Sequence, residues 1–496
     1  MQNNATAAIS FNQIPANIRN PLFYAEVSNE QAGYFVQNSR VMIIGQATGA
    51  PVEAPVLIPS SDFSRATFGA GSQLDVMINA FLANPQNSTL ELWALPLADA
   101  VGATAATNTL TYTGSPTASG TLYLYIGANV VYVPVGSADT VAAIALATVA
   151  AVNAQTQLPV TASALVGVVT FTAKNKGTVG NSLQIQLNFR GAIAGENKIP
   201  GLTTVLTEAV GGATDPNMVL KLPLIGSMEV AFYGHPYSTT IAIGAFTTFL
   251  ANRWHALGGN QDGHAFTALQ GSLSALQTFG LTLNDQHQTV VGFEVTSPSW
   301  ALEVLGAFLG QSAFSLAIDP ARTLQTLTLG GIIPPPEGAR FTLQNRSVLL
   351  NSGIATLKYN RNDVQIERAV TTYQLNSWGQ ADPSYLDVMT LISLTYIKKS
   401  VGYLITQKFP RSKLAPDGTV FGAGQAIVTP KIIRNELIAW YDQMNFIGIC
   451  VKPEDFATNL LVSLNPSDPN RVDILLPPTL IGNLVIAATK VEFRLH

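Results

Sequence analysis

The sequence predicts a multidomain protein of mixed α/β and α+β class. A layered α/β core domain is interrupted by a β-rich inserted domain and followed by an α+β C-terminal domain with extended terminal arms. Three observations predict this class. Strand and helix patterns alternate in two separated stretches, the composition between them becomes rich in Thr, Val, Gly and Ala, and a long strand–helix–turn run follows at 364–418. A chain of 496 residues has room for about three domains.

The α/β core domain is predicted over 27–97 and 213–333. Strand patterns fall at 41–45, 89–95, 229–233, 264–269 and 289–293, and helix patterns at 73–82, 241–254, 272–279 and 299–309. Such alternation is typical of a sheet with helices packed on it.

The β-rich inserted domain is predicted over 98–212. Charged residues are sparse there, and short alternating strands recur around one helix at 139–153. Linkers rich in Gly, Ala and Thr, at 102–107 and 210–215, mark its ends. A β-rich unit that interrupts an α/β pattern indicates an insertion.

The C-terminal domain is predicted over 334–482, after the stiff linker that Pro334, Pro335 and Pro336 form. Alternation from Val364 to Val370 predicts a strand. A helix is expected to begin at Asp382-Pro383, with an apolar stripe formed by Tyr385, Met389, Ile392 and Tyr396. Further patterns predict a helix at 431–444 and strands at 460–464 and 472–476, with a turn (NPSDPN) between these strands.

The two ends of the chain, 1–26 and 483–496, are predicted to be extended arms. Ile9 and Phe11 alternate with polar residues near the start. Val491, Phe493 and Leu495 alternate strictly with charged residues at the end, which predicts a strand with one buried face.

Charged residues make up only 11% of the chain, against about 25% in an ordinary soluble protein. Either copies of the chain or a partner cover much of the surface, or the exterior is polar without being charged. The net charge of -4 gives no reason to expect nucleic-acid binding, because proteins that bind nucleic acids usually carry an excess of basic residues. No apolar stretch reaches the roughly 18 uninterrupted residues of a membrane span, and the N-terminus lacks the layout of a signal peptide. We therefore expect a soluble protein made in the cytoplasm.

Catalytic and metal-binding patterns are weak. His255 and His264, with Asp262 between them, lack the remaining spaced ligand of a zinc site and are interpreted as loop and strand residues. Cys450, the only cysteine, excludes an intrachain disulfide and is expected to be a buried small residue. No phosphate-binding glycine motif or nucleophile elbow occurs. The carboxylates near predicted sheet elements are Glu229, Glu294 and Glu303. We expect no enzyme, metal or cofactor, although an enzyme whose site the fold assembles stays an alternative.

Basic residues gather in the C-terminal domain of a chain otherwise poor in charge. They are Lys398, Lys399, Lys408, Arg411 and Lys413. Such a cluster is typical of a surface that meets an acidic partner or phosphate. The alternative is a solvated helix end, where Lys398 and Lys399 favour the C-terminal dipole.

Several motifs resemble contractile phage tail sheath proteins of the Mu-like type. In chain order they are 346–356 (RSVLLNSGIAT), 366–373 (IERAVTTY), 382–390 (DPSYLDVMT), 409–418 (FPRSKLAPDG), 468–478 (DPNRVDILLPP) and 491–495 (VEFRL). Together they cover most of 340–496. One departure is the turn at 448–451 (GICV), where the family pattern is expected to carry a carboxylate.

The resemblance implies a mechanical function. Sheath subunits stack as hexameric rings around a tail tube protein, between baseplate and tail terminator proteins, and contract to drive the tube through a cell envelope. It implies a location in the virion and no direct membrane insertion. The arms would add strands to neighbouring subunits through Ile9, Phe11, Val491, Phe493 and Leu495. The tube would contact Lys398, Lys399, Arg411 and Lys413. The alternatives are another self-assembling virion or surface protein and an α/β enzyme with a β-rich lid.

Overall fold

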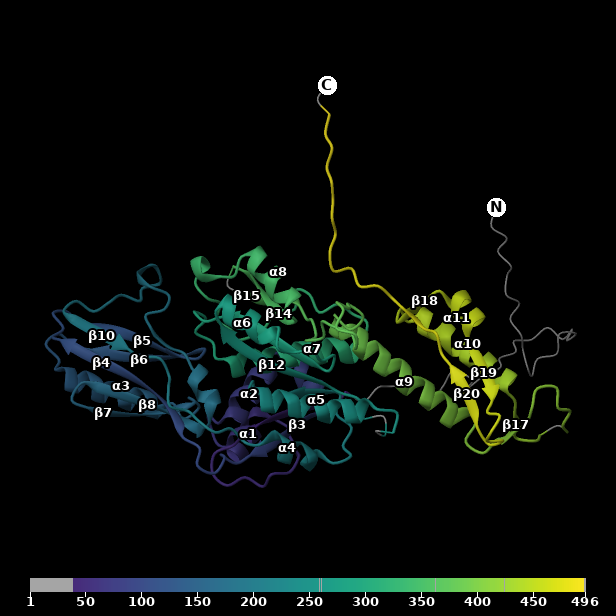
Figure 1. The fold of residues 1–496 in the computed structure, drawn as a ribbon. Helices are drawn as coiled ribbons and strands as arrows, with labels where there is room; N and C mark the ends of the chain where they lie inside the picture. Colours follow the sequence, from purple (N-terminus) through teal and green to yellow (C-terminus); the bar gives the residue numbers. More distant parts are fainter. Residues whose placement is uncertain (1–38, 258, 260, 362, 423, 495–496) are drawn as a thin grey trace, which may run out of the picture.

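An eight-stranded sheet forms the centre of the computed structural model, which describes residues 39–494 apart from 258, 260, 362 and 423 (Figure 1). Its order is β15-β14-β13-β12-β11-β1-β3-β2. The strands from β14 to β3 are parallel, and the edge strands β15 and β2 are antiparallel to their neighbours. The strands are β1 (Val41–Gln46), β2 (Val56–Leu57), β3 (Leu92–Leu97), β11 (Phe232–Gly234), β12 (His264–Gly271), β13 (Gln288–Glu294), β14 (Ile354–Asn360) and β15 (Asp363–Arg368).

The middle strands of this sheet are buried on both faces. Every residue of β1 and of β13 is buried, as expected for parallel strands covered by helices on each side. The covering helices are α1 (Ser61–Phe68), α2 (Gln73–Leu82), α5 (Thr240–Trp254), α6 (Leu273–Gly280), α7 (Ala301–Ile318) and α8 (Leu343–Asn351). The predicted mixed α/β and α+β class is confirmed.

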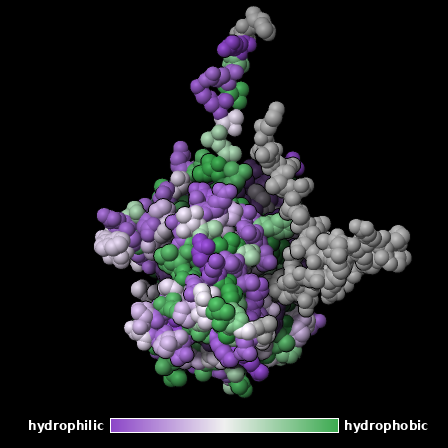
Figure 2. All heavy atoms as spheres, turned by 90° about the vertical axis from the view of Figure 1, so that its right-hand side faces the viewer, coloured by the Kyte–Doolittle hydropathy of each residue, from purple (hydrophilic) through white to green (hydrophobic). Residues whose placement is uncertain are grey.

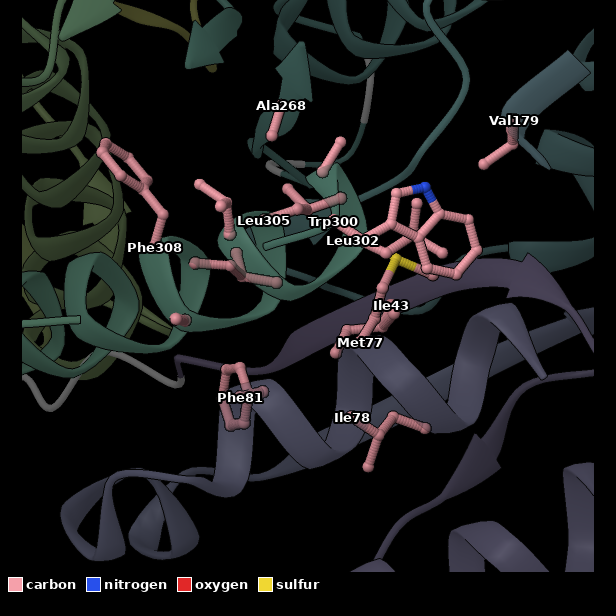
Figure 3. Packing of buried hydrophobic residues seen from close by; sticks show 14 of the residues in the cluster. Ile43, Met77, Ile78, Phe81, Val179, Ala268, Trp300, Leu302, Leu305 and Phe308 are labelled. Atoms are coloured by element: carbon pink, nitrogen blue, oxygen red, sulfur yellow. The ribbon is translucent and has the colours of Figure 1, made fainter. Parts of the chain in front are cut away.

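Two glycines let helix α7 pack closely against α2 (Figure 3). A Cβ atom on Gly306 would lie 2.3 Å from the carbonyl oxygen of Met77, and one on Gly310 would lie 2.2 Å from Nδ2 of Asn87. Leu305 and Phe308 of α7 and Phe81 of α2 belong to the same buried cluster, in which the ring of Phe308 lies 5.8 Å from that of Phe266 on β12. Small residues at a helix crossing permit such an approach of the two backbones. Among the described residues, α7 alone is long and apolar enough to cross a membrane, but 83% of it is buried inside the protein, which marks it as a core helix.

Residues between β3 and β11 form two antiparallel sheets of their own, β10-β4-β8-β7 and β6-β5-β9. These elements are β4 (Ala105–Gly114), β5 (Gly120–Ile126), β6 (Asn129–Val135), α3 (Val141–Ala154), β7 (Val160–Leu165), β8 (Val168–Lys176), β9 (Ile185–Leu187) and β10 (Leu202–Leu206). They form one end of the molecule in Figure 1. Strands β4 and β8 alternate between buried and half-buried residues, as strands with one face on a core do.

The predicted domain boundary at 333 is wrong. Strands β14 and β15 lie after it, yet β14 pairs with β13 in parallel and extends the central sheet. Helix α8 also packs on β14. The three prolines therefore lead back into the same sheet. Sequence alone misplaces the boundary because a proline linker also occurs inside a domain.

Helix α9 (Val388–Lys408) leads from the central sheet to a second packed unit, residues 409–480, which we call the C-terminal unit (Figure 1). Its elements are β16 (Lys413–Leu414), β17 (Ile427–Val428), α10 (Pro430–Phe446), β18 (Cys450–Val451), α11 (Pro453–Asn459), β19 (Leu461–Leu464), β20 (Val472–Leu475) and β21 (Thr479–Leu480). Its buried cluster is separate from that of the sheet and centres on Leu437, Trp440, Tyr441 and Phe456. Cys450 is buried there, as predicted, and burial raises the pKa of its thiol to about 11.

The start predicted for α9, at Asp382-Pro383, is wrong. The carboxylate of Asp382 instead accepts hydrogen bonds from the backbone N–H and hydroxyl of Ser384 and closes a turn. The helix begins at Val388, after Asp387 has paired with Arg368 at 2.9 Å. It then continues to Lys408, so Lys398 and Lys399 lie in its middle rather than at its end.

A buried carboxylate joins the inserted strands to helix α7. Both oxygens of Glu303 accept a hydrogen bond from the backbone N–H of Ala128, at 3.0 and 2.9 Å, and Oε2 also accepts one from the N–H of Trp300, at 2.7 Å. Ala128 follows Gly127 in the turn between β5 and β6, where Gly127 has a φ of +59° and a Cβ would meet the carboxylate at 2.8 Å. The inserted strands are therefore held by this contact as well as by their two chain connections.

Stability is expected to depend on pH through Glu303. Burial raises the pKa of this carboxyl from 4.5 to about 7, although the backbone donors oppose the rise. The folded chain then binds more protons than the unfolded chain between these values, so this group lowers the free energy of unfolding as pH rises from about 4.5 to 7, by about 3 kcal/mol in total. Glu303→Gln is expected to remove this part of the pH dependence. Urea unfolding of both proteins from pH 5 to 8 checks this, and parallel pH profiles would contradict it.

Candidate assembly interface

The last described residues, 481–494, which we call the C-terminal arm, extend away from the body of the protein (Figure 1). Gln325 holds the arm to the core by donating a hydrogen bond from Nε2 to the carbonyl oxygen of Val485, at 3.1 Å. Beyond Ile486 every described residue is exposed. Hydrophobic and hydrophilic residues succeed one another along the arm in Figure 2.

Apolar side chains on the C-terminal arm are exposed to water. Val491 is 81% exposed and Phe493 80%, and Leu484 and Ile486 nearer the body are 77% exposed. The predicted terminal strand is extended in its described part, 491–494, but has no ladder partner there. A strand needs a partner for its backbone N–H and C=O groups, and a one-face pattern needs a surface to cover that face. Ile9, Phe11 and Leu495 lie outside the described residues.

Strands β19 and β20 form a hairpin with two free edges in the C-terminal unit. They pair with each other from Leu461↔Leu475 to Leu464↔Val472, and no third strand joins them within the described chain. Val462 packs from one face onto the buried cluster of the unit. Leu461 and Leu475 lie opposite each other on the other face and are 61% and 60% exposed.

The turn of this hairpin is fixed by Asn465 and by side chains of the motif at 468–478 that follows it. Oδ1 of Asn465 accepts hydrogen bonds from the N–H groups of Ser467 and Asp468, and Arg471 pairs with Asp473 at 2.6 Å. An isolated two-stranded hairpin is only marginally stable, and its free edges can accept another strand. Within the described residues, the chain thus contains both an extended arm without a strand partner and a hairpin whose edges are free to pair.

The motifs at 346–356, 366–373 and 382–390 meet around one groove beside the arm. The groove has a volume of about 860 Å³, and Val485 and Ile486 line one part of it. Its ion pairs are Arg346–Glu367, at 2.7 Å, and Arg368–Asp387. These contacts fix the segment before α9 against strand β15. The polar side chains of these motifs therefore serve to position segments of the chain against one another.

The five predicted basic residues do not form one free surface. Lys398 pairs with Asp262, at 2.8 Å, and Lys399 pairs with Glu229, at 2.6 Å, so both bind the core of their own chain. Lys408 pairs with Glu436. Arg411 and Lys413 are exposed beyond the end of α9. The contact of Lys398, Lys399, Arg411 and Lys413 with a tube stays a prediction, and Arg411 and Lys413 are its two exposed members.

The remaining residues weighed for chemistry have structural partners. Nε2 of His264 lies 2.8 Å from Oγ1 of Thr289, and Asp262 is the partner of Lys398. Glu294 accepts a hydrogen bond from the N–H of Phe341 at 2.6 Å. In the described part of the chain, no group of three or more His, Cys, Asp or Glu side chains is placed to hold a metal ion.

Sequence reasoning missed Leu461, Leu475 and Gln325. The alternation at 460–464 and 472–476 indicated two strands, which the structure confirms as β19 and β20. It did not indicate which face is exposed, because Val462 and Leu461 are equally apolar. Gln325 carries no local signal, since its partner lies 160 residues further along the chain.

One known protein is similar to this chain over its full length. The tail sheath protein of the Mu-like prophage FluMu from Haemophilus influenzae is 36% identical over 494 residues, which are 98% of this chain and 100% of that protein. No protein-family model matches the chain.

Two solved structures are more distant. The sheath tail protein of Desulfitobacterium hafniense has a TM-score of 0.44 at 12% identity, with 93% of this chain and 100% of that one covered. The sheath tail protein Lin1278 of Listeria innocua has a TM-score of 0.46 at 12% identity, with 90% and 92% covered. Family membership rests on the similarity to the FluMu protein.

Proposed function

This chain belongs to the tail sheath proteins of Mu-like phages, and on that premise we propose that it polymerises as stacked six-membered rings around a tail tube. Contraction of this polymer drives the tube through the envelope of a target cell. The observation that carries the proposal is that the described part of one chain contains both an exposed arm without a strand partner and a hairpin with free edges.

The C-terminal arm of one copy adds a strand to hairpin β19–β20 of another. The backbone of 487–494 then gains hydrogen bonds to a hairpin edge, and Val491 and Phe493 cover apolar surface that includes Leu461 and Leu475. Such a contact joins two different surfaces, so it repeats from copy to copy and builds a ring or helix. Ile9, Phe11 and Leu495 take part in the same exchange.

The other partners follow from the same premise. The sheath contacts a tail tube protein, a baseplate and a tail terminator protein. The subunit is made in the host cytoplasm and becomes part of the virion, with no nucleic acid as partner and no direct insertion into a membrane. Its function is structural rather than enzymatic.

Negative-stain imaging of the purified protein tests the polymer directly. Hollow tubes or stacked rings are expected. Small dispersed particles under all conditions of salt and concentration would contradict the proposal and favour the enzyme alternative. Irregular sheets or shells would instead favour another self-assembling virion protein.

The exposed pair Arg411 and Lys413 is expected to contact the tube. Reversing both charges, with Arg411→Glu and Lys413→Glu, is expected to lower co-assembly with tubes roughly tenfold, because each lost exposed ion pair costs up to about 1 kcal/mol per subunit. Sedimentation of sheath with purified tubes measures this. The control, Lys358→Glu, reverses an exposed charge on strand β14. Co-assembly of the double variant at the level of the control would contradict this contact.

A further inference from the structure

Helix α9 is the chain connection between the central sheet and the C-terminal unit (Figure 1). Val388, Met389 and Ile392 in its first half belong to the buried cluster around the sheet. Ile397 belongs to the buried cluster of the C-terminal unit, and Trp440 of α10 donates a hydrogen bond to Ser400, at 3.2 Å. The helix thus passes from one packed body to the other within about one turn.

Two ion pairs hold the helix to the core at the point where it enters the second body. Nζ of Lys398 lies 2.8 Å from Oδ1 of Asp262 and donates a second hydrogen bond to the carbonyl oxygen of Trp254, at 3.1 Å. The same ammonium group lies 5.1 Å from the centre of the Trp254 ring. Nζ of Lys399 lies 2.6 Å from Oε1 of Glu229. The side chain of Asp262 is completely buried, and that of Lys399 is only 7% exposed.

The receiving segments are themselves tied together by Arg253. Its Nε donates to the carbonyl oxygen of Gln261, at 3.1 Å, and its Nη1 donates to that of Gly226, at 3.0 Å. A further hydrogen bond reaches Met228. Arg253 therefore joins the two segments that carry Asp262 and Glu229, the partners of the two lysines.

The two lysines lengthen the part of the helix that the core holds. Without the lysines the anchored length runs from Val388 to Ser393, whose hydroxyl donates to the carbonyl oxygen of Pro320 at 3.3 Å. This length is about 8 Å, and from Val388 to Lys399 it is about 16 Å, at 1.5 Å per residue. The angular freedom of a rod held at two points falls as these points move apart. Holding α9 at Lys398 and Lys399 therefore limits the tilt of the C-terminal unit against the sheet.

We propose that Lys398 and Lys399 with Asp262 and Glu229 form a clamp that fixes the angle between the C-terminal unit and the central sheet. The clamp is a property of the single subunit. Its consequence rests on the proposed function. If the angle stays fixed during contraction, a force on the C-terminal arm is transmitted directly to the central sheet of the same subunit.

The test measures the distance between spin labels on the two bodies in the full-length, unassembled subunit. Thr67→Cys on α1 and Thr458→Cys on α11 place labels at exposed positions, in a Cys450→Ala background. The clamp is removed by Lys398→Met with Asp262→Asn and Lys399→Met with Glu229→Gln, which leaves no buried charge without its partner. The distance distribution is expected to broaden about twofold, in line with the change in anchored length.

Lys408→Met is the matched control. It removes a lysine ion pair from the same helix, but its partner Glu436 lies on α10 within the C-terminal unit, so the distribution is expected to stay narrow. If the fourfold variant fails to fold, Lys399→Met alone takes its place, because its partner Glu229 is 39% exposed and tolerates the loss. A distribution as narrow as that of Lys408→Met would overturn the clamp. Since no assembly is needed, failure to form tubes is a separate result that bears only on the proposed function.

Discussion

Truncation after Thr489 is expected to give a folded subunit that no longer polymerises. The removed residues include Val491 and Phe493, which are exposed in the single chain, so their loss leaves the free energy of unfolding unchanged. In the proposed polymer we expect them to become buried. Burying two such side chains contributes about 3–6 kcal/mol per junction, and its loss weakens each junction by about a hundredfold or more. Sedimentation velocity measures the loss of polymer, and thermal unfolding confirms the fold.

The control for this truncation keeps the length and the apolar face of the arm. Lys490→Gln with Glu492→Gln removes only the ion pair between the two charged residues that alternate with Val491 and Phe493. This variant is expected to polymerise like the natural protein. A truncated chain that still polymerises like the natural protein would refute the strand linkage.

Gly306→Val is expected to prevent the core from packing and to cost several kcal/mol of unfolding free energy. The new Cβ would meet the carbonyl oxygen of Met77 at 2.3 Å, which is backbone and cannot turn aside. Overpacking a tight core costs about 1–3 kcal/mol or more, and here it forces α2 and α7 apart, two of the helices that cover the sheet. Urea unfolding of the soluble fraction measures the loss.

Gly244→Ala provides the comparison for Gly306→Val. It lies within helix α5, where no atom would come within 4 Å of the new Cβ. This substitution is expected to raise the free energy of unfolding by about 0.4–1 kcal/mol, because it restricts only the unfolded chain. Equal stability of the two variants would show that α2 and α7 do not depend on close packing at Gly306.

The central sheet could be predicted because its strands leave a strong local pattern. Buried parallel strands appear as continuous apolar runs such as 41–44 (VMII) in β1, and helices with a regular apolar face alternate with them. The order of the strands and the membership of β14 could not be predicted. Pairing joins residues such as Val290 and Ile354, which no local pattern relates.

The candidate interface could be predicted in part. Alternation indicated the terminal arm and the two strands of the hairpin, since period-two patterns survive even where no partner is present. The role of Lys398 and Lys399 could not be predicted. Their partners lie 136 and 170 residues away, and a lysine that will be buried looks the same in sequence as one that will be solvated.

A cryo-EM reconstruction of the polymer tests the strand linkage most directly. We predict that residues 487–494 of one subunit lie as a strand along β19 or β20 of another, with Val491 and Phe493 against apolar surface. Density that places the arm along its own subunit, with both edges of the neighbouring hairpin exposed, would contradict the strand linkage.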